Sequence, residues 1–160
     1  MRKVVRQASP AAIAVLRQAT ALYPKRKKAS DGLLPSSAHI KQNPNSDHNV
    51  GLAVDLTHDP RNGIDCVVLY QLLQKDKRVS YLIFRGRIWS KERGDRKYTG
   101  YNQHVKHLHI SIKEEHSKDT SPWFPWLKGA SKKTIKDKAV VAVSKVRRPK
   151  KKDKPSPKEN

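Results

Sequence analysis

The sequence is poor in sulfur and in acidic residues. Its 160 residues include one cysteine, one methionine and 14 Asp and Glu against 35 Lys and Arg. With a single thiol, no disulfide can form within the chain, which suits a reducing cytoplasm, and a structural zinc site closed by several cysteines is excluded. Cys66 lies in an apolar run, where we expect it to belong to the core rather than act as a nucleophile. No apolar run reaches the about 20 residues of a membrane-spanning helix.

The scarcity of acidic residues leaves a net charge of +21, which is unevenly spread. Residues 129–160 carry 12 Lys and Arg against 3 Asp and Glu, whereas residues 1–128 carry 23 against 11. We therefore predict a domain over residues 1–128, followed by a basic, disordered tail over residues 129–160. Such a charge attracts polyanions, which include nucleic acid, acidic membranes and an anionic cell wall. Charge alone does not choose among them, and no nucleic-acid motif of known spacing is present.

The N-terminus resembles a signal peptide at first, because basic residues precede an apolar run. Arg17 and Gln18 interrupt this run, and Ser9 and Pro10 form a helix start at its beginning. We therefore predict an amphipathic helix over residues 10–22. The expectation that follows is a protein made in the cytoplasm without a recognisable signal peptide.

Further along the chain, apolar periodicity alternates with turn-forming residues. The expected elements are a strand over residues 53–57, a helix over 64–75, a hairpin over 78–90 with its turn at Arg85 and Gly86, and a strand over 107–112. The approach to residue 46 and the segment 91–100 have the composition of loops. We expect the aromatic cluster over residues 122–126 to close the core; the alternative is that it stacks on sugar rings or bases.

Two stretches carry imidazole and carboxylate groups at spacings suited to a mononuclear metal. From His107 to Ile112 polar and apolar residues alternate, so His107, His109 and Ser111 share one face of a strand. Side chains two apart lie roughly 6.5–7 Å from each other, so one histidine can bind a metal while the other stands beside its water. Asp55 likewise lies on one face of the expected strand over residues 53–57, in which polar and apolar faces alternate. Two histidines and one aspartate leave the fourth zinc position open for water, as hydrolases need.

A family resemblance accompanies these residues. The stretch Ser46–Asp55 fits S-x-H-x-x-G-x-A-x-D without a mismatch, a pattern of the zinc D-alanyl-D-alanine carboxypeptidase and dipeptidase family, which includes phage L-alanoyl-D-glutamate endolysins. The segment 107–113 resembles the H-x-H strand of lysostaphin-type peptidases and of the Hedgehog signalling domain. The resemblance covers most of residues 30–113 and implies zinc on His48, Asp55 and His109. The expected fold is therefore α+β, in which a small antiparallel sheet flanked by helices carries the metal.

The sequence departs from these families at the general base. Many carboxypeptidase-type members carry Glu three residues before the last zinc ligand, where this chain has Lys106. Hedgehog-like members carry an acid six residues before it, where this chain has Gln103. His107 and His104 are the local candidates for proton transfer, and lysostaphin-type enzymes are similar in using the first histidine of H-x-H. We expect His107 to face the metal, whereas the direction of His104 is left open.

Three further residues are candidates for substrate contact. Ser46 is expected to orient His48 or to touch substrate. Arg85 can hold a substrate carboxylate through paired hydrogen bonds, or it is an ordinary solvated turn residue. Tyr98 is expected to shape the cleft.

Two further histidines, His39 and His58, lie before and after the first motif. We predict that His39 lies on a surface loop; lining the cleft is the alternative. His58 and the neighbouring Asp59 are expected to stabilise the loop after residue 57.

The leading hypothesis is a monomeric zinc peptidase acting on peptides of bacterial peptidoglycan after release by another factor. The basic tail would bind anionic wall polymer or nucleic acid. The alternatives are a Hedgehog-like zinc-binding protein without hydrolysis, and a nucleic-acid-binding protein with a structural metal.

Overall fold

The computed structural model describes residues 4–127, so the predicted tail over residues 129–160 lies outside the described residues. The helices are α1 (Pro10–Leu22), α2 (Ser37–Gln42) and α3 (Cys66–Leu72), and the strands are β1 (Ala53–Thr57), β2 (Val79–Phe84), β3 (Arg87–Ser90), β4 (Gly94–Lys97) and β5 (His107–Ile112). Short 3-10 helices cover Asp47–Val50, Pro60–Asn62, Leu73–Lys75, Glu114–His116 and Pro125–Leu127. The fold is α+β, as predicted.

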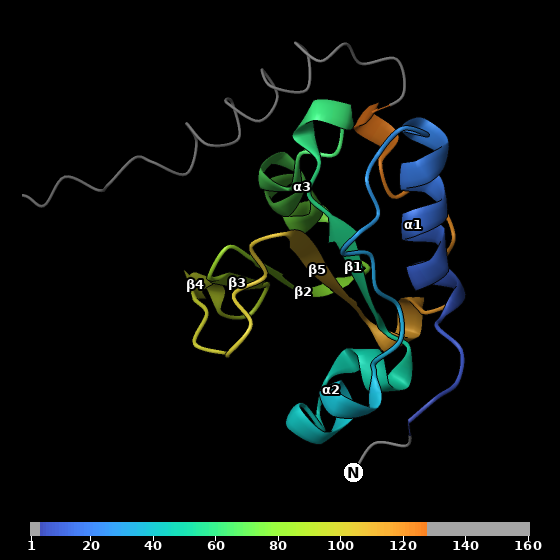
Figure 1. Cartoon of the computed structure of the whole chain (residues 1–160). Coiled ribbons are helices and arrows are strands. Elements are labelled where there is room, and N and C mark those ends of the chain that lie inside the picture. The colour runs from blue at the N-terminus through green and yellow to red at the C-terminus, as the bar shows by residue number, and fades with distance from the viewer. Residues whose placement is uncertain (1–3, 128–160) are drawn as a thin grey trace, which may run out of the picture.

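The five strands form one antiparallel sheet in the order β1-β5-β2-β3-β4. The two motif strands, β1 and β5, are neighbours although about 50 residues separate them in the sequence. In Figure 1, α1 lies beside β1 and β5, and β3 and β4 form the far edge of the sheet. The sheet therefore has a helix-covered face and a second face that is free to carry a site.

The covered face is held by apolar packing. Val54 and Leu56 of β1 and Leu108 and Ile110 of β5 are fully buried in one core cluster with the alanine-rich side of α1. Because side chains alternate along a strand, this arrangement sends Asp55 and His109 to the opposite face.

The N-terminal helix begins as predicted. The Ser9 hydroxyl accepts a hydrogen bond from the backbone N–H of Ala12 at 3.2 Å, and Pro10 is the first helical residue. The aromatic cluster near residue 123 also belongs to the core. Trp123 and Phe124 are buried, and the Arg78 guanidinium lies 3.7 Å from the centre of the Trp123 ring.

Several predicted elements need correction. The segment 91–100 is not all loop, because β4 pairs with β3; an edge strand exposed on both faces has no apolar alternation to reveal it. The approach to the first motif contains α2, capped by the Ser36 hydroxyl. The predicted helix 64–75 begins at Cys66, because the Asp65 side chain caps it, and its last turn is a 3-10 helix.

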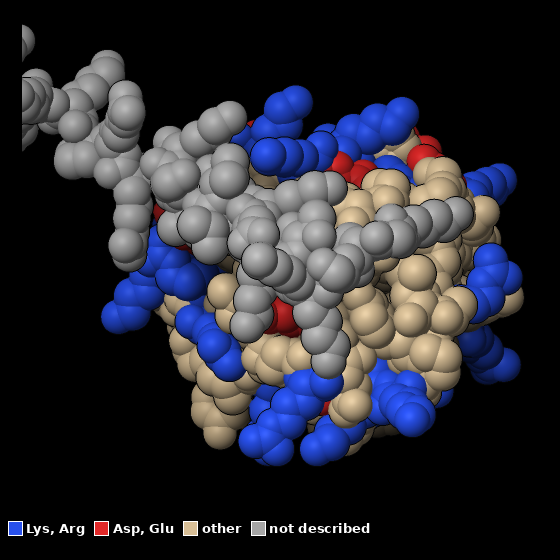
Figure 2. All heavy atoms as spheres, turned by 90° about the horizontal axis from the view of Figure 1, so that it is seen from above, with Lys and Arg blue, Asp and Glu red and all other residues tan. Residues whose placement is uncertain are grey.

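Basic side chains are spread around the molecule. Figure 2 shows Lys and Arg on every side of the outline seen from above, with few Asp and Glu between them. Among residues 4–127, no helix combines the length and the apolar composition needed to cross a bilayer.

Candidate metal centre

The register of β1 and β5 places Asp55 directly opposite His109. Their side chains share the uncovered face of the sheet, where opposite residues on antiparallel strands are in contact range. Nδ1 of His109 lies 3.0 Å from Oδ1 of Asp55. The alternation that was visible in the sequence therefore produces the first contact of the site.

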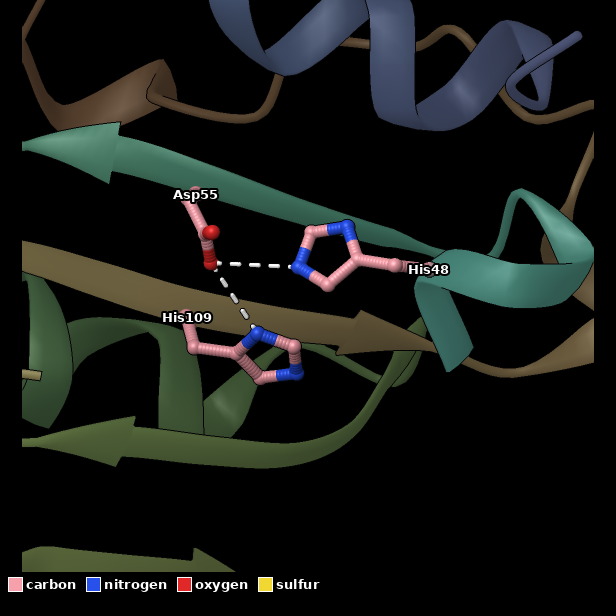
Figure 3. Close-up of side chains that lie close together, drawn as sticks. All are labelled: His48, Asp55 and His109. Atoms are coloured by element: carbon pink, nitrogen blue, oxygen red, sulfur yellow. Dashed lines mark hydrogen bonds and ion pairs between the residues drawn. The ribbon is translucent and has the colours of Figure 1, made fainter. Parts of the chain in front are cut away.

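His48 reaches the same carboxylate from the 3-10 turn before β1 (Figure 3). The turn ends at Gly51, whose φ of 70° lies in the left-handed region, and a Cβ there would come 2.7 Å from the Gln7 carbonyl oxygen. Nδ1 of His48 lies 3.1 Å from the Leu33 carbonyl oxygen, which can only accept, so Nδ1 carries the proton. The lone pair is then on Nε2, which lies 3.3 Å from Oδ1 of Asp55.

These three residues can hold a metal ion. Each offers one donor atom, and the donor atoms of His48, Asp55 and His109 all lie within 4.8 Å of one another. Both histidines are buried, and the Nε2 atoms of both are without a hydrogen-bond partner. Buried polar atoms of this kind call for a partner, and a cation supplies one for an imidazole lone pair.

Two more histidines, His107 and His104, lie close to Asp55. Nε2 of His107, two residues before His109 on β5, lies 3.7 Å from Oδ2 of Asp55. The ring of His104 lies 4.9 Å from that of His107 and 5.5 Å from that of His109, between centroids. Asp55, His104 and His107 form a second group of donor atoms within 4.8 Å.

His104 is held in an unusual backbone conformation. Its φ of 52° is positive, and its backbone N–H donates to Oδ1 of Asn102 at 3.0 Å. Its carbonyl oxygen accepts from the backbone N–H of Arg85 at the β2–β3 turn. Such conformations in non-glycine residues are concentrated at functional sites, and here one turns an imidazole over the centre.

The pKa values of the groups in the cluster are shifted in different directions. Burial lowers the pKa of His48, but the Asp55 carboxylate, whose Oδ1 lies 3.3 Å from Nε2, outweighs this effect and the pKa is raised. Burial raises the pKa of Asp55, but His109 and His48 hold it well below its usual range. Burial lowers the pKa of His104 to about 4, helped by His109 and His107, and burial also lowers the pKa of His107. The last two imidazoles are therefore neutral near pH 7, with a lone pair to accept a proton.

The centre lies on the floor of a cleft of about 1100 Å³. Asp55, His109 and Tyr81 belong to the floor, and the Tyr81 ring stacks on that of His109 with centroids 5.4 Å apart. Residues 39, 42–46, 98 and 101–104 supply further lining. His104 lines this cleft, whereas His107 lies beside it against Asp55.

The predicted substrate-contact residues separate into two kinds. Ser46 and Tyr98 line the cleft; the Ser46 hydroxyl accepts from the His48 backbone N–H at 3.3 Å, and the Tyr98 ring meets His104 edge-on. Arg85 is not brought to the centre, because its guanidinium lies 3.2 Å from Nε2 of His58.

The prediction of a surface-loop position for His39 is wrong. This residue lies on α2 and lines the cleft, with Nε2 at 3.0 Å from the Ser46 hydroxyl. A six-residue helix without a buried residue leaves no periodic pattern in the sequence. The predictions for His58 and Asp59 are confirmed: Nδ1 of His58 accepts from the backbone N–H of Cys66 at the start of α3, and Asp59 accepts from the backbone N–H of Lys27, so both hold the loop after β1 in place.

Several hydrogen bonds that hold the metal-binding residues in place were not predicted from the sequence. The Ser111 hydroxyl donates to the Asp47 carboxylate, which ties β5 to the turn that carries His48. On the other side of β1, Gly32 exchanges two backbone hydrogen bonds with Asp55, and a Cβ on it would come 3.1 Å from Oδ2. Ser111 had been placed on the right strand face, but nothing local signals its partner 64 residues away.

Comparisons with protein-family models, with curated proteins and with solved structures find no match for this chain. The family resemblance described above therefore rests on the two motifs, and the case for a function rests on the geometry of the cluster.

Proposed function

We propose that this chain is a zinc-dependent peptidase that hydrolyses a peptide bond of bacterial peptidoglycan, in the manner of phage endolysins. The observation that carries the proposal is the group of His48, Asp55 and His109 on the floor of a cleft, with two further imidazoles against it. The peptidoglycan substrate is taken from the resemblance of the two motifs.

The donor set suits zinc. Two imidazole nitrogens and one carboxylate oxygen are the ligand types of hydrolytic zinc sites, which keep a position open for water. His48, Asp55 and His109 are the proposed ligands. The bond from His48 to the Leu33 carbonyl fixes the tautomer and ring orientation, a support that metal-binding histidines commonly have.

The chain's own residues supply the remaining chemistry. When bound, zinc polarises the scissile carbonyl and lowers the pKa of water toward roughly 7. His104 and His107, neutral near pH 7, accept the proton of the attacking water and return it to the leaving nitrogen. Ser46 holds the turn that carries His48, and Tyr98 borders the cleft beside His104.

The basic charge supports the same proposed function. A net charge of +21 concentrates the protein on an anionic wall polymer. We propose that the chain is made in the cytoplasm, is released by another factor and acts on the wall as a monomer.

The test of this function is solubilisation of purified sacculi by the full-length protein. We expect zinc-loaded protein to release peptide fragments, chelator-treated protein to release none, and added zinc to restore release. A protein that holds zinc but leaves sacculi intact would contradict the proposal.

One observation favours a second candidate, a zinc-binding protein without hydrolysis. Among the described residues that line the cleft, Asp55 is the sole carboxylate, so none is left there to act as general base. The Hedgehog-like resemblance of β5 agrees with such a role. Zinc binding without cleavage of any wall preparation is the result that favours it.

A further inference from the structure

The two oxygens of Asp55 meet different histidines. Oδ1 lies 3.3 Å from Nε2 of His48 and 3.0 Å from Nδ1 of His109, the two histidines proposed to bind zinc. Oδ2 lies 3.7 Å from Nε2 of His107. In two-metal sites a carboxylate commonly binds one ion with each of its oxygens. The first set of ligands therefore leaves Asp55 with an oxygen for a second ion.

His104 and His107 complete a second set of ligands around that oxygen. The donor atoms of Asp55, His104 and His107 all lie within 4.8 Å of one another. His107 is the first residue of β5, and His104 belongs to the loop before it and is 9% exposed. The backbone of His104 is held at both ends, by Asn102 and by the N–H of Arg85. The second set is thus already assembled by the fold.

The ring nitrogens of this second set lack a partner. Nδ1 of His104 and Nε2 of His107 are both buried without a hydrogen bond. Buried polar atoms of folded proteins are normally paired, so these two call for a ligand. Two imidazole nitrogens beside a carboxylate oxygen are donors that zinc and similar transition metals accept.

We propose that the cluster has a second metal position, in which a divalent ion of the zinc class binds His104, His107 and Oδ2 of Asp55 beside the first ion. Among the described residues that line the cleft, Asp55 is the sole carboxylate, so two dications share one negative charge. Ions in two-metal sites lie about 3.5–4 Å apart, where their repulsion weakens binding of the second. Dialysed protein is therefore expected to keep about one zinc, in the first position.

The second position overlaps with the proton-transfer groups of the proposed function. While only the first position is filled, His104 and His107 are free to accept a proton. An ion on both lone pairs leaves neither of them free, so cleavage should slow as the second position fills. This consequence rests on the proposed peptidase function, whereas the metal position itself does not. Undiminished cleavage with two ions bound would contradict the proton-transfer role of these histidines.

Calorimetric titration of the metal-free, full-length protein with zinc tests the second position without any measurement of activity. The protein carries no affinity tag, so that the histidines are its own. We expect two binding steps, the second at least about tenfold weaker than the first. His107→Ala should keep the first step and lose the second, and His116→Ala, outside both groups of donors, should keep both. A single step in the parent, or an unchanged second step in His107→Ala, would overturn the inference.

Cobalt(II) gives a second measurement that needs no variant. It accepts the same imidazole and carboxylate ligands, and its electron paramagnetic resonance signal reports on neighbouring ions. Two cobalt ions about 3.5–4 Å apart perturb each other, so we expect the signal of the first to weaken as the second binds. A signal that simply doubles would place the second ion elsewhere and overturn the inference. Either negative result leaves the peptidase function standing. Two metal positions in a protein that leaves sacculi intact with one zinc bound would contradict that function and leave this inference standing.

Discussion

At the scale of single residues, the histidines of the cluster differ in what their ring nitrogens meet. His48 uses Nδ1 on a carbonyl and turns Nε2 to Asp55, and His109 turns Nδ1 to the same oxygen. Each of the four rings has one buried nitrogen without a hydrogen-bond partner, which is Nδ1 in His104 and Nε2 in the other three, but His104 and His107 have a lowered pKa. The first two are suited to hold a cation and the last two to move a proton.

Removing a ligand should remove the metal. We expect about one zinc per parental chain, and loss of most of it in His48→Ala and in His109→Ala, because two protein ligands are too few for a stable site. Metal analysis of the purified proteins measures this. His116→Ala is the control, since His116 lies outside the cluster. Full zinc retention in the His48→Ala, His109→Ala double variant would rule out the site.

Removing a proton-transfer group should spare the metal. His104→Ala and His107→Ala are each expected to keep zinc but to lower kcat for muropeptide cleavage about 100-fold, the usual scale for a general acid or base. Lys106→Ala, an exposed neighbour, should cleave like the parent. If both histidine variants also cleave at the parental rate, the base comes from elsewhere in the chain.

At the scale of elements, the site depends on the loop that borders β1. Asp31 accepts hydrogen bonds from Thr57 and forms an ion pair with the buried Arg26 at 2.6 Å. The next residue, Gly32, pairs with the backbone of Asp55. This loop therefore fixes the strand that carries the central carboxylate.

Breaking that ion pair should be costly. Asp31→Ala leaves the Arg26 guanidinium buried without its carboxylate, which typically destabilises a protein by about 3–5 kcal/mol. Urea unfolding of the zinc-free protein measures the change. Glu92→Ala, an exposed surface change, should stay within about 0.5 kcal/mol. Equal stability of Asp31→Ala and the parent would mean that the loop is held by other contacts.

The same scale shows what the sequence could predict. Strands β1 and β5 alternate between core and site, so their bounds and the faces of Asp55 and His109 were predicted correctly. The edge strand β4 and the short α2 bury too little to leave a pattern, and the place of His39 was missed with them. The positive φ of His104 depends on Asn102 and on the turn at Arg85, a tertiary arrangement with no local signal.

At the scale of the whole molecule, charge and chemistry are separated. Among the described residues, the cleft lining is neutral apart from the cluster, while basic side chains lie around the outline seen in Figure 2. Attraction to a polyanion is thus expected to be independent of what the cleft binds.

A chain ending at residue 128 should test the predicted domain boundary. We expect it to unfold cooperatively and to bind zinc like the full chain, since Trp123, Phe124 and Leu127 complete the core before that point. It should bind wall polymer or nucleic acid less tightly, with a weaker salt dependence, because residues 129–160 carry a net charge of +9. Loss of cooperative unfolding would show that the tail belongs to the core.

Whether the Asp55 cluster is a hydrolytic centre is tested most directly by mass spectrometry of muropeptides after incubation with the full-length protein holding about one zinc. The prediction is a set of new peptide termini that disappears in the His48→Ala, His109→Ala double variant and in the parent treated with chelator, and that returns to the treated parent when zinc is added. Unchanged muropeptides in the presence of the zinc-loaded parent would contradict it.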